Sequence, residues 1–165
     1  MVKKLAIVLV LAACAGLVWY FFFNRSDRDQ VIDALHDVAG YVSKEDGEKT
    51  SGMLLKSQLV GSYFADKCVL ALDEQMFSGE YTPEDICANL VRTRQFFNSL
   101  KLTCHEIEVN MPSENEAVID FTCRLRGLLK RGEQINEVRD IRAQLRKESG
   151  RWHFYSFKIR EVLKR

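Results

Sequence analysis

The sequence has few of the residues that mark catalytic or metal centres. It contains three histidines, His36, His105 and His153, and no two have the spacing of metal ligands, so we expect no metal ion and no other cofactor. We expect His36 to be exposed and His105 to be partly buried. None of the five cysteines lies in a C-x-x-C motif, and no nucleophile triad can be assembled. With only two prolines, 28% charged residues and 47% apolar residues, the composition is typical of an ordered globular protein.

The longest hydrophobic run lies at the N-terminus. Residues 5–23 carry no charge and, at about 1.5 Å per residue in a helix, are long enough to cross a bilayer. We therefore predict a cytoplasmic segment at 1–4, a transmembrane signal anchor at 5–23 and one domain at 24–165. Lys3 and Lys4 favour an N-terminus inside the cell, which makes the chain single-pass with an extracytoplasmic, periplasmic domain.

Other interpretations of the N-terminus stay open. Arg25 and Arg28 follow the apolar run and oppose the predicted orientation. A cleaved signal peptide is one alternative, although cleavage leaves part of the apolar run exposed. A lipoprotein is another, because residues 11–14 (LAAC) resemble a lipobox in which Cys14 is acylated; the apolar residues 17–23 that follow are unlike the usual polar tether. All three interpretations place the domain at the same membrane.

The rest of the chain predicts helices first and strands afterwards. Helices are expected at residues 27–43, 48–64 and 82–98, and the last has a clear start in Thr82, Pro83 and Asp85. The second helix is expected to bury Met53, Leu54, Leu59, Val60 and Tyr63. A short strand at 68–72 and a loop at 73–81 come between the second and third helices. Four antiparallel strands follow at 102–110, 117–129, 135–147 and 152–162, which indicates an α+β fold.

Alternation along these strands separates an inner from an outer face. Ile119, Phe121, Cys123 and Leu125 are expected to face the core. The outward positions include four arginines: Arg124, Arg126, Arg142 and Arg146. Cross-strand ion pairs with Glu106 and Glu108 are one interpretation; an interaction face for a second copy or an anionic partner is the other. Residues 24–120 carry 9 Lys and Arg against 18 Asp and Glu, whereas residues 121–165 carry 13 against 5.

Two cysteines are equidistant from the centre of the predicted hairpin. Cys104 and Cys123 are expected to face each other across neighbouring strands and to form a disulfide if the domain is in an oxidising compartment. Alternatively Cys68, Cys87, Cys104 and Cys123 are four small buried thiols.

Three segments together resemble the nuclear transport factor 2-like superfamily, which includes SnoaL-like polyketide cyclases and ketosteroid isomerases. They are residues 94–100 (RQFFNSL), 116–121 (EAVIDF) and 147–154 (KESGRWHF). The resemblance implies three helices packed on a curved antiparallel sheet, an apolar cone that opens at one end, and an outer sheet face that often forms dimers. Enzymes of the superfamily use pocket carboxylates with Tyr, His or Arg partners. No set of positions here matches those motifs, so no catalytic residue is assigned.

Two carboxylates deserve comparison with the structure. Asp120 lies between core positions but is turned outward by strict alternation, and Asp73 precedes the loop expected near the rim of the cone. General acid–base catalysis requires a carboxyl group with a shifted pKa within reach of the substrate. The sequence alone does not identify either residue as such a group.

We therefore expect a membrane-anchored, non-catalytic binding or assembly module that takes a small apolar ligand or a protein partner. A lyase or isomerase acting on a small apolar substrate in the cone is one alternative. A structural homodimer formed through the outer sheet face is another. A nucleic-acid partner is not expected, because the net charge is only +1.

Overall fold

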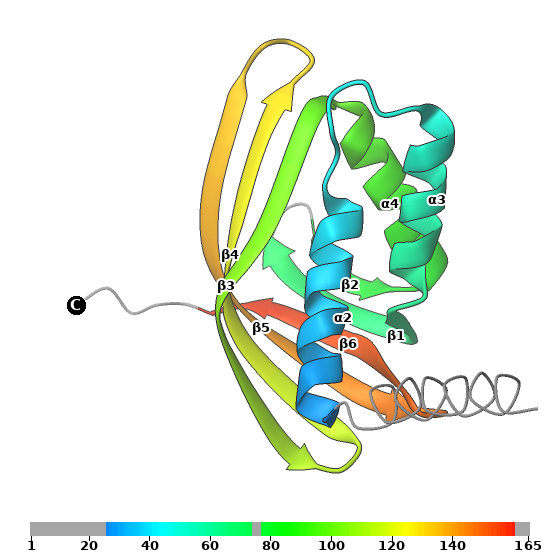
Figure 1. The fold of residues 1–165 in the computed structure, drawn as a ribbon, viewed down its shortest axis with the longest axis vertical. Helices are drawn as coiled ribbons and strands as arrows, with labels where there is room; N and C mark the ends of the chain where they lie inside the picture. Colours follow the sequence, from blue (N-terminus) through cyan, green and yellow to red (C-terminus); the bar gives the residue numbers. More distant parts are fainter. Residues whose placement is uncertain (1–25, 74–76, 161–165) are drawn as a thin grey trace, which may run out of the picture.

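The chain folds into a strongly curved sheet with three helices on its concave side (Figure 1). The computed structural model describes residues 26–73 and 77–160. The predicted span at 5–23 and Cys14 lie outside these ranges. None of the helices in the described ranges is both long and apolar enough to cross a membrane.

The three helices are α2 (Asp27–Val42), α3 (Thr50–Gly61) and α4 (Pro83–Gln95). The predicted cap of α4 is confirmed, and α2 is capped in a similar way by Ser26. Ser26 Oγ accepts a hydrogen bond from the Asp29 amide at 3.2 Å. Thr82 Oγ1 accepts from the Asp85 amide at 3.2 Å, and Asp85 Oδ2 accepts from the Thr82 amide at 3.1 Å. These reciprocal bonds satisfy amides that the first turn of a helix cannot pair internally.

Six strands form one sheet in the order β2-β1-β6-β5-β4-β3. They are β1 (Phe64–Asp73), β2 (Phe77–Tyr81), β3 (Phe97–Ser113), β4 (Glu116–Leu129), β5 (Gln134–Glu148) and β6 (Arg151–Ile159). All neighbouring pairs are antiparallel except β1 and β6, which are parallel. Ser149 and Gly150 both have positive φ and form the tight turn that was predicted between the last two strands.

Several sequence expectations about element boundaries are wrong, including the start of β3, which lies at Phe97 instead of residue 102. Residues 77–81, expected to be a loop, form strand β2, and β1 begins at Phe64 instead of residue 68. Because β2 is an edge strand with residues 78–80 exposed, no apolar alternation marks it. Helix α4 ends at Gln95 instead of residue 98, since the chain turns into β3 and buries Phe97.

Helix α3 buries only part of the face that was predicted: Met53 and Val60 are buried as expected. Leu54 and Leu59 are exposed, whereas Met53, Ser57, Val60 and Gly61 are buried. A Cβ added at Gly61 would lie 2.6 Å from Cys87 Sγ, so the small residue lets α3 approach α4 closely. The prediction from hydrophobicity chose the wrong leucines for the buried face, because small side chains make the contact between α3 and α4.

Arg94 on α4 is the one charged residue that is fully buried in the described chain. Its Nη1 donates to the Tyr41 carbonyl at 2.9 Å, and its Nη2 donates to the Ser43 carbonyl at 3.1 Å and to Glu48 Oε2. The Glu48 carboxylate also pairs with Lys56 Nζ at 2.9 Å. Arg94 therefore ties the end of α2 and the segment before α3 to α4. The sequence gives no signal for this, since Arg94 looks like an ordinary helix-surface cation.

The electrostatic environment keeps Glu48 ionised. Burial opposes the charged form, but the hydrogen bonds from Lys56 and Arg94 outweigh it and hold the pKa of Glu48 below its usual value. A carboxyl whose folded pKa is lowered stabilises the fold above its unfolded pKa. This stabilisation is lost as the pH falls through the folded pKa.

We predict that Glu48→Gln lowers the free energy of unfolding by about 3 kcal/mol, because it leaves the Arg94 guanidinium buried without its counter-charge. Chemical denaturation at neutral pH measures this loss. The matched control is Glu80→Gln, which breaks the exposed pair with Lys67 and is expected to cost at most about 1 kcal/mol. The difference between wild type and Glu48→Gln should shrink as the pH falls below about 4. An equal decrease in the free energy of unfolding for the two variants would show that the Arg94–Glu48 pair contributes no more to stability than an exposed ion pair.

Candidate functional site

The space between the sheet and the helices is filled by apolar side chains. The rings of Phe64, Phe154 and Phe157 contact one another, with centroids 4.9 to 5.8 Å apart. Ile119 and Leu145 on the neighbouring strands have no exposed surface. Helix α2 closes this core with a stripe of buried residues: Val31, Ala34, Leu35, Val38 and Ala39. The interior is therefore packed with the protein's own side chains where a ligand cone was expected.

No carboxylate or imidazole among the described side chains is buried in this interior. The buried polar residues there are Ser57, Arg94 and Ser156. His36 is exposed on α2, as expected, whereas His105 is exposed on the outer sheet face, which corrects the expectation of partial burial. The exposure of His105 follows from its alternation with buried Cys104. The interior thus offers no described carboxylate or imidazole for acid–base chemistry.

Asp120 lies on the outer face, where alternation placed it. It accepts hydrogen bonds from Arg142 Nε and Nη2, both at 2.8 Å, and the guanidinium holds the pKa of Asp120 below its usual value. Asp73 ends β1, but its side chain lies outside the described part of the structure. Neither residue therefore supplies a proton acceptor in a described cavity.

A hollow of about 350 Å³ beside α2 contains the only tyrosine–carboxylate hydrogen bond in the described chain. Tyr63 Oη donates to Asp37 Oδ2 at 2.8 Å. Burial and the Asp37 carboxylate both raise the pKa of Tyr63. A phenol with a raised pKa is a weaker proton donor, so this pair is poorly suited to act as a general acid near neutral pH.

The outer face of the sheet carries a cluster of cations where β3 and β4 pair. Lys101 lies directly opposite Arg126, and Thr103 lies opposite Arg124. Together with His105 these residues line a hollow of about 160 Å³, which we call the basic hollow. His105 Nε2 lies 3.2 Å from Thr103 Oγ1. The basic hollow is therefore built by side chains from two neighbouring strands.

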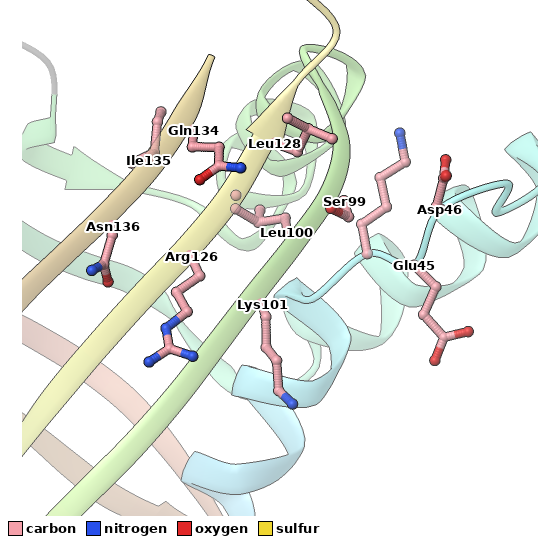
Figure 2. Close-up of a pocket in the computed structure, with 12 residues that line it drawn as sticks. Glu45, Asp46, Ser99, Leu100, Lys101, Arg126, Leu128, Gln134, Ile135 and Asn136 are labelled. Carbon is pink, nitrogen blue, oxygen red and sulfur yellow. The ribbon is translucent and has the colours of Figure 1, made fainter. Parts of the chain in front are cut away.

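A second and larger hollow adjoins it. About 730 Å³ in volume, this large hollow extends over the ends of β3, β4 and β5 and reaches the segment at residues 44–46. It shares Lys101 and Arg126 with the basic hollow. Figure 2 shows these two side chains projecting from adjacent strands, with Gln134 and Asn136 on the next strand. The two hollows form one groove along the sheet, and its volume is in the range of sites that bind small molecules.

The cations of the basic hollow have no acidic partner among the described residues. The expected ion pairs with Glu106 and Glu108 do not form there. Glu106 has a φ of 51° at a break in the β3–β4 register, and its carboxylate accepts a hydrogen bond from Thr122 at 3.0 Å. Beyond that break Glu108 lies opposite Asp120. The register places Thr103 opposite Arg124 and Lys101 opposite Arg126, so both acids lie further along β3 than these two arginines.

The other two arginines of the predicted face are differently placed. Arg142 pairs with Asp120, and Arg146 stacks over the Tyr155 ring, 5.0 Å from its centroid, with Glu148 at 4.0 Å. All four arginines are exposed on the outer face, but only Arg124 and Arg126 line the groove. Sequence reasoning missed Lys101 and His105 as members of this cluster, because the predicted strand began after Lys101 and His105 was expected to be partly buried.

Cys104 and Cys123 occupy directly opposed positions on β3 and β4, and both thiols are free in the structure. The hydrogen bond between the two thiols lowers the pKa of Cys123 and raises that of Cys104. Cys68 is buried in the core, where burial raises the pKa of its thiol to about 12. The opposed pair is therefore the one described place where a disulfide would join two strands.

Comparison with solved structures finds the same architecture in other proteins. The Kfla4162 protein of Kribbella flavida has a TM-score of 0.68 at 15% identity, covering 81% of this chain and 88% of its own. A proposed scytalone dehydratase of Novosphingobium aromaticivorans has a TM-score of 0.64 at 14% identity, covering 83% and 85%. The type 3 hexachlorocyclohexane dehydrochlorinase LinA of Novosphingobium barchaimii has a TM-score of 0.62 at 14% identity, covering 81% and 84%.

These neighbours decide the fold. The domain has the nuclear transport factor 2-like cone fold. No family model matches the sequence, and no curated protein is similar enough to count as a relative. At 15% identity or less the likeness carries the fold alone.

We predict that Cys104 and Cys123 form a disulfide when the full chain is produced in an oxidising compartment. A bridge closing this hairpin should raise the free energy of unfolding by about 3 kcal/mol relative to the reduced protein. Peptide mass spectrometry without reductant identifies the linked peptides, and denaturation with and without reductant measures the stability. Cys68→Ser is expected to leave the linked peptides unchanged. Complete alkylation of both Cys104 and Cys123 in unreduced protein would contradict the prediction.

Proposed function

We propose that this protein is a membrane-anchored, non-catalytic binding or assembly module that contacts its partner through the groove on the outer sheet face. One observation carries the proposal. The described interior is filled by apolar side chains, whereas the outer face at β3, β4 and β5 presents an open groove with unpaired cations. Open volume and uncompensated charge thus coincide at this groove.

The charge of the groove favours an anionic partner over a second copy of the chain. Two copies joined symmetrically through this surface would bring Lys101, Arg124 and Arg126 close to the same residues of the other copy. Like charges brought together in this way repel each other. The homodimer hypothesis therefore fits the basic part of the groove less well than an anionic partner does.

The membrane anchor remains part of the proposal on sequence grounds. Residues 5–23 are uncharged and long enough to span a bilayer, and Lys3 and Lys4 favour an extracytoplasmic domain. Acylation at Cys14 would tether the domain to the same membrane. In each case the groove would be held within reach of membrane components.

The alternative is a lyase acting on a small apolar substrate. What favours it is that two structural neighbours are named as a dehydratase and a dehydrochlorinase. This alternative requires an apolar cavity inside the cone with an ionisable side chain directed into it. The packed ring cluster of Phe64, Phe154 and Phe157 is difficult to reconcile with that requirement.

We predict that the groove is covered in the native membrane. In the variant Asn136→Cys, a membrane-impermeant thiol reagent should react several-fold more slowly in native membranes than in purified full chain in detergent. Asn136 lines the large hollow and is exposed, so only a bound partner would slow its reaction.

The control is His36→Cys, which places a thiol on the exposed surface of α2, on the helical side of the sheet. Its reaction rate should be the same in native membranes and in detergent. Equal rates for Asn136→Cys in the two preparations would overturn the proposal that this face contacts a partner.

A further inference from the structure

The basic hollow places cations from two strands around one small space. Lys101 and His105 on β3 and Arg124 and Arg126 on β4 surround the Thr103 hydroxyl. At about 160 Å³ the hollow has the volume of roughly five water molecules. A space of this size suits a small anionic group better than a drug-sized molecule.

The arrangement is unfavourable for the empty protein. Lys101 and Arg126 are like charges at directly opposed positions of an antiparallel pair, which destabilises a sheet. Two carboxylates of the outer face are engaged elsewhere: Glu106 accepts a hydrogen bond from Thr122, and Asp120 pairs with Arg142 and Arg160. An external anion would therefore relieve a repulsion that no described side chain relieves.

The donor set matches the chemistry of phosphate. Each guanidinium can offer two parallel N–H donors to two oxygens of one phosphate, and the Lys101 ammonium adds a compact charge. The Thr103 hydroxyl donates a long, 3.5 Å hydrogen bond to the Arg124 carbonyl, which a bond to a ligand oxygen can replace. His105 Nε2 lies beside that hydroxyl and can support it. These donors belong to side chains on regular strands, which hold their positions better than loops do.

We propose that the basic hollow binds the phosphate group of a phosphomonoester, with the remainder of the molecule lying in the large hollow. The shared residues Lys101 and Arg126 join the two spaces, so one ligand can occupy both. Glu45 and Asp46 line the far part of the large hollow, which disfavours a second anionic group there. This inference rests on the proposed function of the outer face and names the chemistry that the face recognises.

The test is calorimetric titration of the full chain, in nanodiscs of phosphatidylcholine at low salt, with inorganic phosphate and with phosphoethanolamine. Saturable binding of either probe is expected. In the double variant Arg124→Gln/Arg126→Gln the affinity should fall about tenfold or more, because charged hydrogen bonds to the phosphate are removed.

A matched control removes the same charge from the same face. Arg142→Gln/Arg146→Gln changes two arginines that line neither hollow, and its affinity should stay within about twofold of wild type. In the absence of phosphate the groove variant should unfold at or above the temperature of wild type, because the repulsion between Lys101 and Arg126 is removed. Such a result would show that a loss of binding is not misfolding. Equal loss in both double variants, or no saturable binding by wild type, would overturn the phosphate site.

A further arm identifies the source of the phosphate. Nanodiscs that also contain phosphatidic acid should weaken the binding of soluble phosphate if headgroups reach the basic hollow. Unchanged binding of soluble phosphate assigns the site to a soluble ligand, and both results support a phosphate site. Failure of this inference is distinguishable from failure of the proposed function. Protection of Asn136→Cys without phosphate binding would leave the docking face intact and remove only its phosphate chemistry.

Discussion

The contact among the rings of Phe64, Phe154 and Phe157 determines how the rest of this fold can be used. Phe64 begins β1 and the other two rings lie on β6, so the cluster sits where the two strands run parallel at the centre of the sheet. Burying each ring is worth about 1.5 to 3 kcal/mol, and the ring contacts add about 0.5 to 1.5 kcal/mol per pair. Their packing against Ile119, Leu145 and helix α2 fills the concave side of the sheet. The outer face then carries the open volume that is lined by unpaired cations.

A second constraint lies at the edge of the helical layer. The buried Arg94 guanidinium links the end of α2, the segment before α3 and α4 through two carbonyls and Glu48. The Lys44 amide and carbonyl both hydrogen-bond with Leu100 at the edge of β3, so the same segment is also fixed to the sheet. Since residues 44–46 form one wall of the large hollow, this internal ion pair positions part of the groove without facing it. The contacts of Arg94 and Lys44 therefore hold the helices in place and also position one wall of the groove.

The sequence predicted features that depend on local pattern. The cap at Thr82 was predicted because its hydrogen bonds join residues three apart. The inward positions of Ile119 and Phe121 and the outward positions of Arg124 and Arg126 followed from strict alternation. Edge strand β2 was missed because an exposed edge has no apolar period, and the buried face of α3 was misjudged because small residues make its contact.

The features that matter most for function depend on non-local geometry. Arg94 looks like a surface cation until α2 and the segment before α3 fold over it. The expected pairs of Arg124 and Arg126 with Glu106 and Glu108 failed because Thr103 and Lys101 occupy the positions opposite these arginines. The sequence indicated that the outer face is basic. Only the structure shows which cations remain unpaired and that they line a hollow.

The proposed function depends on two features: the interior of the cone is packed with side chains, and the partner binds at the outer face. A crystal of the full chain pressurised with xenon tests it most directly, because xenon enters dry apolar cavities in proteins. If the cone is packed with side chains, no xenon should bind between α2 and the concave face of the sheet. A xenon atom bound among Phe64, Phe154 and Phe157 would show an open apolar cone, contradict the account and return the lyase hypothesis to first place.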